Sequence, residues 1–480
     1  MRLSAIAITP RNLTLFGIPL DFILFGLTLL SVAVFHHHTM RVALAGLATI
    51  TIYKTLFTGF KTGNGVIGFV SHLQLEWAFL VNLLCLLTGF AVLSRHFEKS
   101  HIPLLLPRFL PHDWRGGFIL LAMVWVLSSF LDNIAGALIG GAMAHQLFRA
   151  KVHIGYLAAI VGAANAGGAW SVLGDTTTTM MWIAGVSPLQ VFEAIIPAAT
   201  ALIVLGIPAA ITQHKYFPIL KRVHEHLHLD WIRIGIVGLI LTLALATNVV
   251  VNVKFRQHAE QFPFIGVAVW VAILLSISLR RPDWEVLPSA LRSSIFLLSL
   301  VLIASMMPVE RLPIASWHTA LGLGFLSAVF DNIPLTALAL KQGGYDWGGL
   351  AYAVGFGGSM IWFGSSAGVA ISSIFPEARS VVAWIRGGWF VVAAYVLGFM
   401  VMLMLLGWHP QPELRPKHGP PGGGIEQVHI KLDATGAFIA NRRWGAIAGG
   451  AQEQEYSRDR RTVPAYGNAV SSPGSNSSTH

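Results

Sequence analysis

Residues 128–134 read Ser-Ser-Phe-Leu-Asp-Asn-Ile, and forty residues later residues 174–179 read Gly-Asp-Thr-Thr-Thr-Thr. Similar motifs return in the second half of the chain, as Ser-Ala-Val-Phe-Asp-Asn-Ile-Pro at residues 327–334 and Gly-Ser-Ser at residues 364–366. The two Asp-Asn pairs are 199 residues apart, and both lie inside apolar sequence. One sequence unit is therefore used twice.

The composition indicates the solvent around these polar motifs. The chain has 480 residues, of which 54% are hydrophobic and only 11% are charged, and its mean hydropathy is +0.65. A soluble globular protein has a charged fraction of roughly 25%. The apolar runs are about 20 residues long, which suits helices that cross a ~30 Å hydrocarbon core better than the short alternating strands of a barrel. We therefore predict an all-α polytopic membrane protein.

The chain is basic, with a formal net charge of +10 and a pI near 9.9. The basic residues lie in loops between apolar runs and in the C-terminal tail. In a membrane protein, such loops indicate orientation rather than a polyanionic partner. We expect the lipid bilayer as a partner and no nucleic acid.

The order of the apolar runs predicts about ten transmembrane helices and two inverted repeats. Each repeat is expected to contain a re-entrant hairpin with Asp-Asn at its tip and a helix broken at its glycines, including the diglycines 167–168 and 357–358. Arg115 precedes the first hairpin and Lys151 follows it, so the positive-inside rule places both ends in the cytoplasm. An odd number of crossings separates the two copies and inverts the second, as in secondary transporters.

This reading divides the chain into five parts. They are N-terminal spans with an interfacial linker (1–115), a first repeat (116–213), a basic cytoplasmic loop with scaffold spans (214–308), a second repeat (309–408) and a disordered tail (409–480). The tail is rich in Pro, Gly and Ser, which is typical of segments that form no packed core.

Three carboxylates, Asp132, Asp175 and Asp331, lie within apolar runs. A carboxylate inside a membrane is costly unless it is paired, protonated or facing water, so each is a functional candidate. Small hard cations take oxygen ligands from carboxylates, amides, hydroxyls and freed backbone carbonyls. The candidate ion- or substrate-binding residues are Asp132, Asn133, Ser129, Gly174, Asp175, Thr176, Thr177, Asp331, Asn332, Ser327, Gly364, Ser365 and Ser366. Competition of a cation and a proton for one carboxylate is the simplest basis for cation/proton exchange.

The same patterns have other interpretations. An Asp-Asn pair can mark an ordinary loop, although two copies in matched context argue against that. Thr178 and Thr179 can satisfy backbone groups at a helix N-terminus with Asp175 as its N-cap. Helix N-termini after Gly174 and Gly364 could bind an anion, which the nearby carboxylates disfavour. The spans show no nucleophile with a base and no zinc-ligand spacing, so we expect neither an enzyme nor a cofactor. Paired inverted hairpins also suit alternating access better than a continuous channel.

Three runs carry a resemblance to a known family: Phe-Leu-Asp-Asn, Gly-Asp-Thr-Thr-Thr-Thr-Met-Met-Trp-Ile and Ser-Ala-Val-Phe-Asp-Asn-Ile-Pro-Leu. They resemble bacterial NhaD-type sodium/proton antiporters, which are grouped with arsenite permeases and dicarboxylate carriers in the ion transporter superfamily. The resemblance covers about residues 30–405. It implies a scaffold domain and a transport domain, commonly in a homodimer, with ions held where hairpin tips meet broken helices. The matching positions are Asp132, Asn133, 174–177, Asp331, Asn332 and 364–366.

The sequence departs from the family at the first hairpin tip. The family often continues with threonines after Asp-Asn, whereas this chain has Ile-Ala-Gly-Ala at residues 134–137. The first tip therefore offers fewer hydroxyl ligands.

The sequence thus predicts a secondary active transporter of the bacterial inner membrane. We expect a sodium or lithium/proton antiporter in which Asp132, Asp175 and Asp331 are candidate sodium ligands and proton carriers. The alternative is an anion transporter of the same superfamily, for arsenite or a di- or tricarboxylate, with or without sodium coupling.

Overall fold

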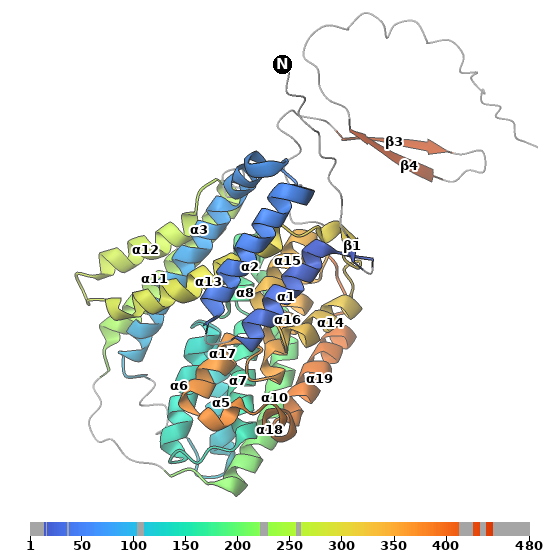
Figure 1. The fold of residues 1–480 in the computed structure, drawn as a ribbon. Coiled ribbons are helices and arrows are strands. Elements are labelled where there is room, and N and C mark those ends of the chain that lie inside the picture. Colours follow the sequence, from blue (N-terminus) through green and yellow to red (C-terminus); the bar gives the residue numbers. More distant parts are fainter. Residues whose placement is uncertain are drawn as a thin grey trace, which may run out of the picture. The chain divides into compact units, whose positions relative to one another are not determined.

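The computed structural model describes residues 14–15, 17–35, 38–102, 110–220, 229–255, 261–411, 426–432 and 438–444. The chain divides into two compact units, Met1–Leu414 and Arg415–His480. The described part of the first unit is helical (Figure 1), apart from the short antiparallel strands β1 (Thr14–Leu15) and β2 (Ile18–Pro19).

One group of helices comes from the N-terminal third and from the middle of the chain. It comprises α1 (Leu20–Val34), α2 (Thr39–Tyr53), the π-helix η2 (Lys54–Thr58), α3 (Gly65–Glu98), α11 (Trp231–Lys254), α12 (Phe264–Ser276), η4 (Trp284–Val286) and α13 (Leu287–Ser305). The long helix α3 packs against α11, α12 and α13, and α2 packs against α1 and α13. These helices lie together in Figure 1.

Two helical pairs stand at the predicted hairpins. They are α5 (Trp114–Ser128) with α6 (Asn133–Leu147), and α14 (Trp317–Ser327) with α15 (Asn332–Gln342), joined by η5 (Val309–Arg311) to α13. In each pair the two helices contact one another and only four residues separate them. Each Asp-Asn therefore lies at the junction of two helices that contact one another.

Two further segments are helices with a break inside them. The first is α7 (Ile154–Ala169) followed by α8 (Thr176–Ile183), and the second is α16 (Trp347–Gly357) with the 3-10 turn η6 (Gly358–Met360), followed by α17 (Ser366–Ile374). All residues of α16 and all but the first of α7 are buried. These two helices form the centre of the unit.

The first diglycine differs from the prediction, because α7 continues through it to Ala169, whereas the second diglycine marks the end of α16. Gly167 lies inside α7, and Gly357 is the last residue of α16. A Cβ atom at Gly167 would lie 2.1 Å from the carbonyl oxygen of Trp125, and one at Gly357 would lie 2.2 Å from that of Gly324. Each glycine therefore lets a hairpin backbone touch a central helix.

The remaining helices surround this centre. They are α9 (Pro188–Phe192), α10 (Ile195–Tyr216), η7 (Pro376–Arg379), α18 (Val381–Gly387) and α19 (Trp389–Leu405). The helix α10 packs against α5, α7 and α19.

Among the residues that the structure describes, five helical segments are long and apolar enough to cross a membrane: Thr39–Thr58, Gly65–Glu98, Pro188–Tyr216, Trp231–Val251 and Trp284–Ser305. A sixth span is possible if α18 and α19, which meet at a 61° bend, count as one. The chain is thus a multi-pass helical membrane protein. Ten spans were expected, but several of those helices are too short or are interrupted, such as Leu20–Val34 and Ile154–Ala169.

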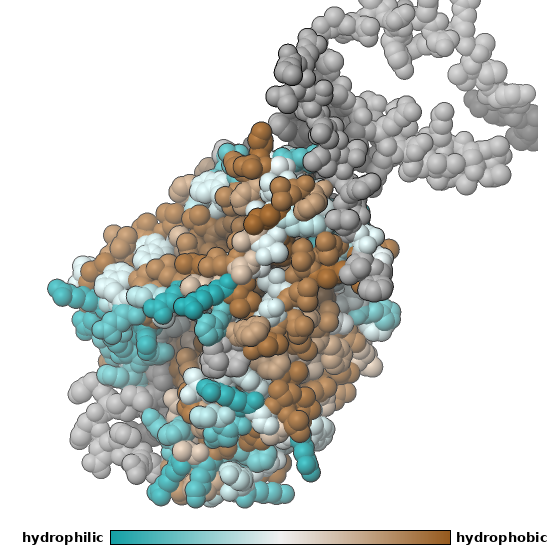
Figure 2. All heavy atoms as spheres, viewed as in Figure 1, coloured by the Kyte–Doolittle hydropathy of each residue, from teal (hydrophilic) through white to brown (hydrophobic). Residues whose placement is uncertain are grey.

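Apolar side chains fill the inside of the unit and also cover much of its outside. Figure 2 shows apolar residues over most of the visible face, with hydrophilic side chains gathered toward its lower end and left edge. Ile67, at 81% exposed, and Met404, at 82%, are examples of large apolar side chains on the surface. A lipid-facing surface accounts for such exposure, which a water-facing surface of this size would not tolerate.

The second unit contains the strands β3 (Glu426–Leu432) and β4 (Phe438–Trp444), which pair antiparallel. They fall within the segment 409–480 for which the composition predicted disorder. The other residues of that segment after 411 lie outside the described residues, so disorder of the tail stays a prediction.

Candidate functional site

Four polar residues of the two motifs occupy the same kind of position, directly before the first residue of a helix. Asp132 precedes α6 and Asp331 precedes α15, with φ/ψ of −56°/145° and −51°/142°. Asp175 precedes α8 and Ser365 precedes α17. The first N–H groups of a helix have no intrahelical partner, so all four side chains lie beside donors that need a partner from outside the helix.

Glycine allows the breaks to approach the hairpin tips. A Cβ atom at Gly174 would lie 2.4 Å from the carbonyl oxygen of Ser128, and one at Gly364 would lie 2.4 Å from that of Ala328. The predicted residues Gly174 and Gly364 therefore contribute by the absence of a side chain, which lets the two backbones come into contact.

Serine hydroxyls fasten each hairpin to its broken helix. Ser128 donates to the carbonyl of Ala164 at 2.6 Å, and Ser327 donates to the carbonyl of Val354 at 2.7 Å. Ser129, another predicted ligand, donates within its own helix end to the carbonyl of Val126. Ser129 and Ser327 thus satisfy backbone groups in this structure.

Asp175 is the centre of a polar network. Its Oδ1 accepts a hydrogen bond from Asn133 Nδ2 at 3.0 Å, and its Oδ2 accepts from Thr177 Oγ1 at 2.5 Å and from Asn332 Nδ2 at 3.2 Å. The residue is only 3% exposed. The tips of both hairpins therefore meet at one buried carboxylate.

Asn165 extends this network to the second break. Its Oδ1 accepts from Asn133 Nδ2 at 3.0 Å, while its Nδ2 donates to Ser359 Oγ at 2.9 Å and to Ser365 Oγ at 3.0 Å. Sequence reasoning missed Asn165 and Ser359. An amide in the otherwise apolar run of α7 was the available signal, because a buried amide needs partners.

The threonines after Asp175 have separate roles. Thr178 Oγ1 donates to the carbonyl of Ser171 at 2.6 Å, and Thr179 Oγ1 donates to the carbonyl of Val172 at 2.9 Å. These two hydroxyls satisfy backbone carbonyls of the break, as one interpretation of the sequence predicted, although the Asp175 side chain makes no capping hydrogen bond.

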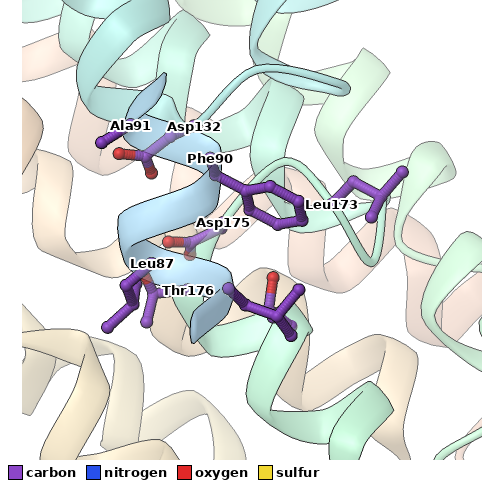
Figure 3. A pocket seen from close by; sticks show the side chains of 9 residues that line it. Leu87, Phe90, Ala91, Asp132, Leu173, Asp175 and Thr176 are labelled. Carbon is purple, nitrogen blue, oxygen red and sulfur yellow. The ribbon is translucent and has the colours of Figure 1, made fainter. Parts of the chain in front are cut away.

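A cavity of about 50 Å³ lies between the first break and α3. It is lined by Leu86, Leu87, Phe90, Ala91, Asp132, Leu173, Asp175, Thr176 and Thr179. Figure 3 shows Asp132 beside Ala91 and Asp175 beside Thr176, with both carboxylates against α3. Since one water needs only ~10–15 Å³ by the same measure, this space accepts a small cation with a water or two.

The predicted carboxylates do not all meet. Asp132 and Asp175 share the cavity wall, whereas Asp331 is not among its lining residues. In the part of the chain that the structure describes, no group of three or more His, Cys, Asp or Glu side chains could hold a metal ion together. Ser366, the last predicted ligand, is half-buried at the start of α17.

The fold and this site define a multi-pass helical membrane protein in which two carboxylates, Asp132 at a hairpin tip and Asp175 at a helix break, line a cavity large enough for a small cation. No family model matches the chain. Two proteins of Arabidopsis thaliana, sodium/proton antiporter 1 and sodium/proton antiporter 2, are 27% and 28% identical to it over 54% and 58% of this chain. The Na+/H+ antiporter NhaD of Vibrio parahaemolyticus is 26% identical over 54% of this chain and 72% of its own length.

These matches confirm the resemblance to NhaD-type antiporters. The chain spans about half of the first Arabidopsis protein (49%) and 73% of the second.

Proposed function

We propose that this protein is a secondary active transporter that exchanges a small monovalent cation, sodium or lithium, for protons. The observation that carries this proposal is the shared cavity of Asp132 and Asp175. The names of the similar proteins, which are sodium/proton antiporters, support it.

The two carboxylates give the cavity its chemistry. Two negative charges in the wall of one small cavity repel one another. Either a cation between them or a proton on one of them relieves the repulsion. A cation and protons then compete for the same oxygens. Two acidic walls disfavour an anionic cargo, which is the alternative within the superfamily.

The network around Asp175 supplies the coupling. Asn133 and Asn332 donate to opposite oxygens of its carboxylate. A cation that takes these oxygens competes with both amides, so occupancy is transmitted to both hairpin tips. Asp331, next to Asn332, is the third carboxylate of the proposed site and becomes a ligand when the helices rearrange.

We also propose that the chain crosses the membrane ten times and contains two inverted repeats. The ion pairs Lys99–Asp283 and Arg280–Asp230 join loops at one end of the helices, and Lys61 pairs with Glu310 at the other. The hydrogen bond from the Leu220 N–H to the Leu147 carbonyl brings the end of the first hairpin back to the end of α10. By the positive-inside rule, the basic flanks of the proposed re-entrant hairpin lie at the cytoplasmic face, which we take to be that of a bacterial inner membrane. A homodimer, implied by the resemblance, stays a prediction.

Proton movement in acid-loaded everted vesicles tests the proposed function. We expect sodium or lithium to release protons from vesicles with the wild-type protein, and Asp175→Asn and Asp132→Asn to abolish this response. Asp283→Asn is the matched control, because Asp283 pairs with Lys99 away from the cavity. It should retain the response.

The contrary result is equally defined. Folded wild-type protein that responds to neither sodium, lithium nor potassium contradicts the proposal. Uptake of arsenite or a dicarboxylate by the same vesicles then establishes the alternative.

A further inference from the structure

The helix α15 touches both the carboxylate network and α3, at its two opposite ends. At its first residue, Asn332 donates to Asp175, and at its last turn Lys341 forms an ion pair with Glu76 of α3. Its eleven residues span about 16 Å. A rigid helix of this length transmits a displacement at one end to the other.

The ion pair lies on the face of α3 that also walls the cavity. Glu76, Leu83, Leu87 and Phe90 are spaced by seven, four and three residues, which places them on one helical stripe. Leu87 and Phe90 line the cavity with Asp132 and Asp175. Glu76, the carboxylate of this stripe, therefore lies about three helical turns along α3 from Leu87 at the cavity.

The opposing face of α15 has the same construction. Ile333, Ala337 and Lys341 recur at intervals of four residues, and the first two belong to the apolar core cluster that also contains Leu83 of α3. The Lys341 side chain is 22% exposed and that of Glu76 is 13% exposed. Both charges are therefore largely removed from water. Either charge would be disfavoured at this place without the other.

From this placement we propose that the Lys341–Glu76 ion pair is a lock between α15 and α3 that must open during each transport cycle. The proposal rests on the proposed exchange function. The cavity is walled by α3 on one side and by the helix breaks on the other, so a change of access moves these walls apart. Glu76 belongs to α3 on one side of that boundary, and Lys341 belongs to α15, whose Asn332 donates to Asp175 on the other side. Their attraction therefore stabilises the state in which the pair is formed.

A reversible cross-link across the lock tests this proposal. In a Cys85→Ala background, Glu76→Cys and Lys341→Cys are combined in the full-length protein, reconstituted in vesicles and treated with a short bis-methanethiosulfonate linker. We expect cation-triggered proton movement to fall about tenfold or more when the linker forms and to return after reduction, because a fixed boundary stops a conformational step. Mass spectrometry verifies the linkage.

The matched control uses another buried ion pair. Asp21 Oδ1 in α1 and Lys54 Nζ in η2, the π-helix that continues α2, lie 3.1 Å apart. Linking Asp21→Cys to Lys54→Cys in the same way should leave exchange unchanged, because both helices lie on one side of the boundary.

Three outcomes separate the possibilities. Unchanged exchange in the linked 76/341 variant overturns the lock and leaves the proposed function intact. Absence of exchange in wild-type vesicles overturns the proposed function and the lock with it. If the cysteine variant is inactive before linking, Glu76→Lys combined with Lys341→Glu replaces it. Exchange restored relative to either single reversal supports the pair, and no restoration overturns it.

Discussion

The two helix breaks have nearly the same backbone but carry different side chains. Asp175 precedes α8 with φ/ψ of −145°/148°, and Ser365 precedes α17 with −144°/153°. Two residues further on, the first break has Thr177, which donates to Asp175, whereas the second has Ala367. The backbone of a break therefore needs no carboxylate, so the carboxylate of the first break has a role other than folding.

The positions ten residues earlier show that the two breaks are complementary. Asn165 precedes Asp175 by ten residues and makes hydrogen bonds to Asn133 at the first hairpin tip and to Ser365 at the second break, while Gly355 precedes Ser365 by ten. A Cβ atom at Gly355 would lie 3.3 Å from Asp175 Oδ2. One break provides the charge and the other leaves room for it.

Moving the carboxylate between the breaks has the largest expected effect. Asp175→Ser combined with Ser365→Asp keeps one carboxylate and one hydroxyl at the two helix starts, but Ser365 is not among the residues that line the cavity. We expect exchange to fall about 100-fold, since losing a buried charge partner weakens binding by ~3 kcal/mol. Proton flux at several sodium concentrations measures it.

The single variant Asp175→Ser is the control for this relocation. It should be as inactive as the double variant. Recovery in the double variant alone would mean that the two breaks are interchangeable, which contradicts the asymmetry.

Placing a methyl group on the central helices should affect both halves alike. Gly167→Ala and Gly357→Ala each direct a Cβ atom at a backbone carbonyl, at 2.1 and 2.2 Å. We expect each to lower the free energy of unfolding by about 1–3 kcal/mol through overpacking. Thermal unfolding in detergent, followed by tryptophan fluorescence, measures this. A loss confined to one half would show that the two hairpin contacts are not equivalent.

The sequence predicted the membrane class and the four polar positions at helix starts, because apolar runs and glycines with Asp, Asn or Ser leave few other interpretations. It was wrong only about the first diglycine, which lies inside α7, since a diglycine within a helix and one at its end look alike in sequence. In the structure Gly167 serves a helix contact, whereas Gly174 serves the break.

Side-chain partners could not be predicted, because they depend on how distant segments pack. Asn165 meets Ser359 and Ser365 across about 200 residues of sequence. Asp331 does not line the cavity although its neighbour Asn332 donates to Asp175, and no local pattern reports this difference. Local chemistry thus identified the starts of the helices, and tertiary packing decided which of them share a cavity.

Removing the serine fasteners should have a smaller effect, and again an equal one. Ser128→Ala and Ser327→Ala each leave one buried carbonyl, of Ala164 or Val354, without its hydroxyl donor. We expect about 1 kcal/mol lower stability for each, with unchanged apparent sodium affinity. Thermal unfolding and the sodium dependence of proton flux measure the two quantities separately. A change in affinity for Ser327→Ala would return that hydroxyl to the cation ligands.

The smallest effects are expected within the run of threonines that only the first break has. Thr177 donates to the carboxylate of Asp175, whereas Thr178 donates to the carbonyl of Ser171. Thr177→Val should therefore change the apparent sodium affinity about threefold with little change in stability, since one hydrogen bond contributes ~1 kcal/mol or less. Thr178→Val should lower the free energy of unfolding by ~1 kcal/mol or less, which is the contribution of one hydrogen bond, and leave the apparent sodium affinity unchanged. The opposite result would be a change in sodium affinity for Thr178→Val and a change in stability for Thr177→Val. It would place the cation at the backbone carbonyls of the break rather than at the Asp175 carboxylate. The two breaks would then differ in their carbonyls.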